Sequence, residues 1–233
     1  DPRDAHALTN RGFSRTRRGD LRGALSDYDR AIELAPREAS PYANRGWTRA
    51  LLGDHERAIA DLDRALELDP RCAQAHVSRG WVELARGEPR AAIAHLERAL
   101  ELDPRNADAL AGRGAARVAL GDARAARPDL DRAIALDPSN GDTFMTRGGV
   151  RATLGDLRGA LADHDRAIAL GPRNARAFVG RGWARACLGD NQGALQDYDR
   201  ALELEPESVY ALGDRGAVKA RLGDLQGALA DYD

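Results

Sequence analysis

The side chains of this sequence that are best suited to chemistry are five histidines and two cysteines. A metal site needs three or four such ligands close together, and a nucleophile needs a base beside it. His76 and His95 fall within the same 34-residue stretch of the sequence, but two histidines alone are a weak basis for a metal site. Cys187 has no histidine and acidic partner placed for nucleophilic catalysis, so we interpret it as a structural thiol.

Acidic residues are plentiful, with 37 aspartates and glutamates, but they recur at a fixed interval. Paired carboxylates that follow from a repeat are not evidence of acid–base catalysis, which needs a local exception to the pattern. Glycine-rich phosphate loops are also absent, because each Arg-Gly pair lies inside an expected helix. We therefore predict a protein that is not an enzyme and that has no cofactor and no metal.

The interval is 34 residues, and Arg-Gly pairs mark it along the whole sequence. The glycines of these pairs are Gly12, Gly46, Gly80, Gly114, Gly148, Gly182 and Gly216. A fixed period of this length is typical of proteins built from stacked repeats. The elements that position every side chain are therefore those of one repeat.

Two helices are predicted in each repeat, and the second repeat shows their signals. Ser40 is a suitable N-cap, Pro41 suits the first turn, and apolar residues follow to Leu52. Gly53 ends this helix A, and Asp54 can cap a helix B that continues until Asp69-Pro70.

Counted from Ala39 as position 1, glycine stands at positions 8 and 15, alanine at 20 and 27, a bulky residue at 24 and proline at 32. This pattern resembles the tetratricopeptide repeat over essentially the whole sequence. The resemblance implies an all-α fold, a right-handed superhelical solenoid of antiparallel helix pairs. We expect one solenoid over residues 1–233, with repeats at 5–38, 39–72, 73–106, 107–140, 141–174, 175–208 and a partial repeat at 209–233. Asp1-Pro2-Arg3 matches the end of a repeat and Asp233 lies inside a helix B, so we expect an excerpt of a longer array.

Charged positions depart from the family pattern. Arginine replaces the usual leucine at position 7, and aspartate fills position 23 in every repeat except the third. We predict ion pairs between positions 7 and 23, with position 11 coupled to 23. In repeat three, position 11 is Glu83 and position 23 is His95, so the charge signs are exchanged. Glu83 should therefore pair with His95 or Arg79. The alternative is that these residues are solvated surface charges without fixed partners.

Pro128, inside helix B of repeat four, should bend that helix, whereas Pro89 should begin one.

Candidate binding residues follow from the same resemblance, which implies a concave face lined by A helices. Ligand contacts in the family come mainly from positions 2, 5, 6, 9, 12 and 13, and all three tryptophans fall on position 9. Asparagine at position 6 resembles ladders that hold a peptide backbone. The predicted partner-binding residues are Asn10, Phe13, Asn44, Trp47, Trp81, Met145 and Trp183. Packing between repeats is the alternative role of the tryptophans.

We therefore expect a protein–protein interaction scaffold that binds a peptide segment or helix in its concave groove. The alternative is a regulatory or oligomerisation arm of a larger multidomain enzyme. Net charge of −2 with both signs interspersed disfavours nucleic acid, and no apolar run is long enough for a membrane span. Two distant cysteines and a single lysine, Lys219, favour a cytoplasmic protein of bacterial origin. Exposed terminal repeats predict end-to-end self-association.

Overall fold

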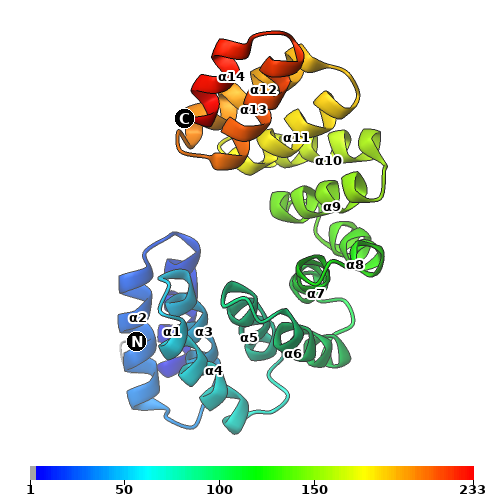
Figure 1. Cartoon of the computed structure of the whole chain (residues 1–233). Helices are drawn as coiled ribbons and strands as arrows, with labels where there is room; N and C mark the ends of the chain where they lie inside the picture. The colour runs from blue at the N-terminus through cyan, green and yellow to red at the C-terminus, as the bar shows by residue number, and fades with distance from the viewer. Residues whose placement is uncertain (1–3) are drawn as a thin grey trace. The chain divides into compact units, whose positions relative to one another are not determined.

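A computed structural model describes residues 4–233, so Asp1-Pro2-Arg3, which we matched to the end of a repeat, lies outside the described residues. The described residues form fourteen helices and no strand (Figure 1). A helices are α1 Ala5–Arg17, α3 Ala39–Leu51, α5 Ala73–Ala85, α7 Ala107–Ala119, α9 Gly141–Thr153, α11 Ala175–Cys187 and α13 Val209–Arg221. B helices are α2 Leu21–Leu34, α4 His55–Leu68, α6 Pro89–Leu102, α8 Ala123–Leu136, α10 Leu157–Leu170, α12 Asn191–Leu204 and α14 Leu225–Tyr232. The predicted all-α fold class is confirmed.

Contacts group the helices into two compact parts, Asp1–Leu120 and Gly121–Asp233. Helix α7 ends the first part and α8 begins the second. Within each part, consecutive A and B helices pack as pairs, and each B helix also contacts the next A helix. A helices of neighbouring repeats contact each other as well, whereas no such contact joins neighbouring B helices among the described residues. Within each part the A helices therefore form the inner row.

Turns between the two helices of a repeat depend on the glycine at position 15. All seven of these glycines have φ between 78° and 90°, a conformation that other residues rarely adopt. In six of the seven repeats the next residue is an aspartate that caps helix B, as Asp54 does by accepting a hydrogen bond from the Arg57 amide at 3.2 Å. In repeat three this residue is Glu88, which makes no side-chain capping bond. Glycine and aspartate together fix where helix A ends and helix B begins.

The expected N-cap of helix A in repeat two was wrong. The cap is Glu38, which makes no side-chain capping bond, and Ser40 lies inside α3. Asn106, Asn140 and Asn174 do cap their A helices at the equivalent position. Ser40 was chosen because serine is a favourable capping residue, but the repeat places the N-cap one residue before Ala39.

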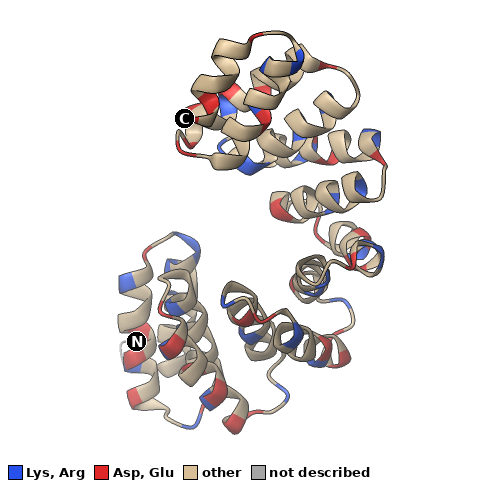
Figure 2. Ribbon diagram, in the orientation of Figure 1, with Lys and Arg blue, Asp and Glu red and all other residues tan. Residues whose placement is uncertain are grey.

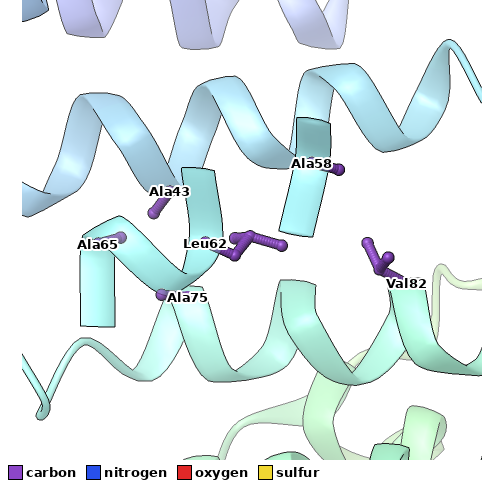
Figure 3. Close-up of a cluster of buried hydrophobic side chains, with 6 residues drawn as sticks. All are labelled: Ala43, Ala58, Leu62, Ala65, Ala75 and Val82. Atoms are coloured by element: carbon purple, nitrogen blue, oxygen red, sulfur yellow. The ribbon is translucent and has the colours of Figure 1, made fainter. Parts of the chain in front are cut away.

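Close packing of the two helices depends on position 8. A Cβ atom at Gly46 would lie 2.8 Å from Cγ of Leu62, the bulky residue at position 24. Leu62 of α4 lies between α3 and α5 with Ala43, Ala75 and Val82 around it (Figure 3). The position-20 alanines are buried in all seven repeats. Small residues at 8 and 20 thus let a large one at 24 fill the space between three helices.

Proline has two different roles in the B helices. Pro89 is the first residue of α6, as predicted. Pro128 lies inside α8, which is as long as the B helices α2, α4, α6, α10 and α12. The bend expected near Pro128 stays a prediction.

Candidate functional site

Arginine at position 7 forms the most regular polar arrangement of the structure. In repeat two, Arg45 donates to both carboxylate oxygens of Asp61, from Nε at 2.8 Å and from Nη2 at 2.6 Å. Arg49, at position 11, donates to the same carboxylate at 2.7 Å. The equivalent pairs are Arg11 with Asp27, Arg147 with Asp163, Arg181 with Asp197, and Arg215 with Asp231. The predicted pairing of positions 7 and 23 is confirmed in these five repeats.

Each of these arginines from repeat two onward also reaches back to the preceding repeat, which the sequence analysis missed. Nη1 of Arg45 donates to Asp29 at 2.6 Å, and Nη1 of Arg181 donates to Asp165 at 2.7 Å. The acceptor stands at position 25, which is acidic in all repeats. The recurrence of an acidic residue at position 25 was the sequence signal from which this contact could have been predicted. We call the whole arrangement the arginine ladder, meaning the position-7 arginines with the acidic residues of positions 23 and 25.

Repeat three departs from the ladder in the expected way. Arg79 pairs with Glu83 on its own helix and with Asp63 of the preceding repeat at 3.1 Å. His95 instead lies beside His76, with their Nδ1 atoms 3.4 Å apart. Burial lowers the pKa of both imidazoles, so both rings are neutral near pH 7. Glu83 therefore uses Arg79, one of the two partners predicted.

Metal binding finds no support at this histidine pair. Cys72 stands one helical turn before His76, a spacing that the sequence analysis overlooked. Among the described residues, however, no group of three or more histidine, cysteine or acidic side chains is arranged to hold a metal ion. Burial raises the pKa of the Cys72 thiol, which opposes formation of the thiolate that binds metals. Cys72 and Cys187 are both free.

The position-9 aromatic residues lie on the inner row of helices. Phe13 is 50% exposed and Trp183 is 40% exposed, whereas Trp47 and Trp81 are half-buried. Trp81 packs against the cluster that contains Val77 and Leu96. These rings are neither fully buried core residues nor free surface residues. Each lies on an A helix and keeps part of its surface exposed.

The other predicted binding residues divide between the two parts of the chain. Asn10 is exposed and Asn44 half-buried, both in Asp1–Leu120 with Phe13, Trp47 and Trp81. Met145 lies in the second part with Trp183, and it packs against the cluster that contains Phe144. Their common role in binding stays a prediction.

Charges of both signs are spread over the helices of each part (Figure 2). No helix within residues 4–233 is long and apolar enough to cross a membrane. Asp214, at position 6 of repeat seven, is the acidic exception on a position otherwise filled by small or neutral residues. The sequence analysis assigned this residue no role.

Comparison with known proteins gives a consistent result. The family profile for the tetratricopeptide repeat matches residues 9–71, 44–107, 77–141, 113–175 and 181–233. Among curated proteins, none matches. The crystal structure of YrrB, described as a TPR protein with an unusual peptide-binding site, is 30% identical with a TM-score of 0.60. That match covers 79% of this chain and 95% of YrrB.

Two more distant solved structures share the fold. PilF of Pseudomonas aeruginosa is 17% identical, with a TM-score of 0.77 over 93% of this chain and 97% of that one. The Cut9-Hcn1 structure of an APC/C hetero-tetramer is 15% identical, with a TM-score of 0.86. That match covers 94% of this chain and 43% of the other.

Proposed function

We propose that this chain, which belongs to the tetratricopeptide repeat family, is a non-enzymatic scaffold that binds an extended segment or helix of a partner protein against its A helices. The carrying observation is the exposure of Trp183 and Phe13 at position 9 of the inner row. Large rigid rings give much contact area at small entropic cost, and tryptophan is enriched among the residues that dominate binding energy. The likeness to YrrB, which is described as having a peptide-binding site, supports the same class of ligand.

We also propose a cytoplasmic location in a bacterium. Both cysteines are free, which suits a reducing compartment. Lys219 is the only lysine among 35 basic residues, a bias that a GC-rich genome would produce. The mixture of charges along each part favours a protein partner over nucleic acid.

The proposal is tested by alanine substitution at position 9. A phage-displayed library of random 15-residue peptides is selected on the whole chain, and the affinity of a selected peptide is measured by titration. Trp183→Ala should weaken this peptide by about 1 kcal/mol or more if the ring is a main contact. Leu34→Ala, at an exposed site on the C-terminal end of α2, is the control and should bind as the wild type does.

Thermal melting of both variants separates lost contacts from lost structure. Equal affinity of wild type and of the Trp47→Ala, Trp81→Ala and Trp183→Ala variants would show that these rings only pack between repeats.

Self-association is a second proposed property, favoured by the surface of α14. Leu229 is 62% exposed and Tyr232 is 55% exposed, although the residues at the same two positions of α12, Leu195 and Tyr198, are half-buried and buried. A second copy of this chain could cover this apolar face. Sedimentation velocity at rising concentration should show association of the wild type, and Leu229→Glu should abolish it. A monomeric wild type at high concentration would contradict the proposal.

A further inference from the structure

Asp214 of α13 differs from the other acidic residues of the A and B helices. Most carboxylates of the arginine ladder accept hydrogen bonds from arginine, whereas the carboxylate of Asp214 has no ion pair and no hydrogen bond within residues 4–233. It is nevertheless half-buried, and burial raises the pKa of its carboxyl. Removing part of the water around a carboxylate is unfavourable, and a cationic ligand would offset this loss.

Three basic side chains of α13 bind groups other than Asp214. Arg215 pairs with Asp199 and Asp231, and Lys219 pairs with Asp231 at 2.9 Å. Nη1 of Arg221 donates to the backbone carbonyl of Ala186 at 3.4 Å. None of these basic side chains pairs with Asp214.

Trp183 is the aromatic neighbour of this position. The relationship is seen in repeats three and four, where a Cβ atom at Gly112 would lie 3.3 Å from Cε2 of Trp81. Gly112 and Trp81 occupy positions 6 and 9 of successive repeats, and Asp214 and Trp183 occupy the same two positions on α13 and α11, which are in contact. From this equivalence we infer that Asp214 lies near the indole of Trp183, which is 40% exposed.

Tyr210 provides a second ring on the same face of α13 as Asp214. It precedes Asp214 by four residues on α13, and side chains at this spacing are neighbours on one face of a helix. Its side chain is 81% exposed. Position 2 is exposed in all seven repeats, so the exposure of Tyr210 is a property of the position.

Tyr198, the buried position-24 residue of repeat six, has surroundings that differ from those of its counterpart in repeat one. In repeat one the equivalent Tyr28 hydroxyl lies 3.3 Å from Thr16, which in turn contacts Thr48. The residues equivalent to these two threonines are Ala186 and Val218. Tyr198 therefore lacks both hydroxyl neighbours, and Asp214 is the leading charge acting on it.

We propose that Asp214, Trp183 and Tyr210 form a subsite for a lysine or arginine side chain of the bound peptide. This inference rests on the proposed function, since it names one residue of the same ligand. The carboxylate supplies a charge-assisted hydrogen bond, and the two rings offer faces that attract a cation. The neutral or small residues at position 6 of the other repeats would not select for charge.

A positional-scanning library of capped ten-residue peptides tests the subsite, with one position at a time fixed as arginine, lysine, norleucine or glutamate. The wild-type chain should prefer arginine or lysine over norleucine by about tenfold at one position. Asp214→Asn keeps the size of the side chain and should remove this preference, and Asp214→Arg should convert it into a preference for glutamate. Glu207→Gln, an exposed acidic site in the loop before α13, is the matched control and should leave it unchanged.

The outcomes separate the two proposals. Binding of peptides without a basic preference, or a preference that survives in Asp214→Asn, would overturn the subsite and leave the scaffold proposal intact. An absence of binding to any peptide in the library would overturn the proposed function and the subsite with it.

Discussion

Arg147 of α9 donates two hydrogen bonds to Asp163 of α10, at 2.9 and 2.7 Å, and a third to Asp131 of α8 at 2.9 Å. Three helices of two successive repeats are thus tied through one guanidinium. Asp163 is buried, and it also accepts an ion pair from Arg151 at 3.0 Å. This carboxylate offsets two largely buried positive charges.

Asp163→Ala should therefore destabilise the chain by about 3 kcal/mol, because it leaves two arginines with little access to water and without their main partner. Urea unfolding followed by circular dichroism measures the change. Glu33→Ala breaks the exposed pair between Arg30 and Glu33 and should cost less than about 1 kcal/mol. Similar losses in the two variants would contradict the role given to burial.

Gly46→Ala should destabilise by about 1 to 3 kcal/mol, because the new methyl group would lie 2.8 Å from Leu62 Cγ and 3.0 Å from the carbonyl oxygen of Ala58. Gly149→Ala is the matched control inside α9, where nothing lies within 4 Å of the added atom. That substitution should stabilise by up to about 1 kcal/mol through helix propensity. Thermal melting distinguishes the two signs.

Pro128→Ala should raise the melting temperature. The site is exposed and lies inside α8, where proline removes a backbone donor at a cost of about 3 kcal/mol. Pro89→Ala, at the first residue of α6, should change stability little. The backbone N–H of a first helical residue has no partner within the helix, so its absence in proline costs little. An unchanged melting temperature for Pro128→Ala would show that α8 already accommodates the proline without loss.

Stability should fall as the pH drops below about 6.5, and His164 should account for part of the loss. His164 is 4% exposed, its Nδ1 has no hydrogen-bond partner among the described residues, and burial lowers its pKa. Asp163, Asp165 and Asp197 oppose this shift, and Arg181 adds to it. A folded-state pKa below the unfolded value means that protons bind the unfolded chain more tightly, so the stability present above the unfolded pKa is lost on acidification.

The measurement is the free energy of unfolding at pH 7.5 and at pH 5.5. His164→Leu should reduce the difference between the two, since leucine fills the same position in three other repeats. The difference that remains includes His76 and His95, whose pKa values burial also lowers. His6→Gln, at an exposed residue, should leave the difference unchanged, and an unaltered difference in His164→Leu would refute the assignment.

The period made most of the fold predictable. Gly53 and Asp54 mark the same turn in the sequence and in the structure, because both signals depend on the local backbone. Arg45 and Asp61 were paired correctly because the geometry of one helix pair fixes positions 7 and 23. Asp29 was missed as a partner because contacts between repeats depend on how the pairs stack, which a single repeat does not specify.

The candidate site was less predictable for the same reason. The period put Trp81 and Trp183 on one position, yet Trp81 is half-buried and Trp183 is 40% exposed. His164 was treated only as a possible metal ligand, although its position is the one that fills the space between helices. Only the packed structure reveals its buried, unbonded nitrogen.

The reach of each position-7 arginine into the preceding repeat has a consequence for how the array melts. A linear array of repeats behaves as a one-dimensional chain of coupled elements, in which the strength of nearest-neighbour coupling sets how many elements unfold together. Arg45, Arg147 and Arg181 place part of that coupling in ion pairs with half-exposed aspartates. Salt screens such pairs. A higher ionic strength would therefore change the number of repeats that unfold together. It would broaden the unfolding transition as well as shift its midpoint.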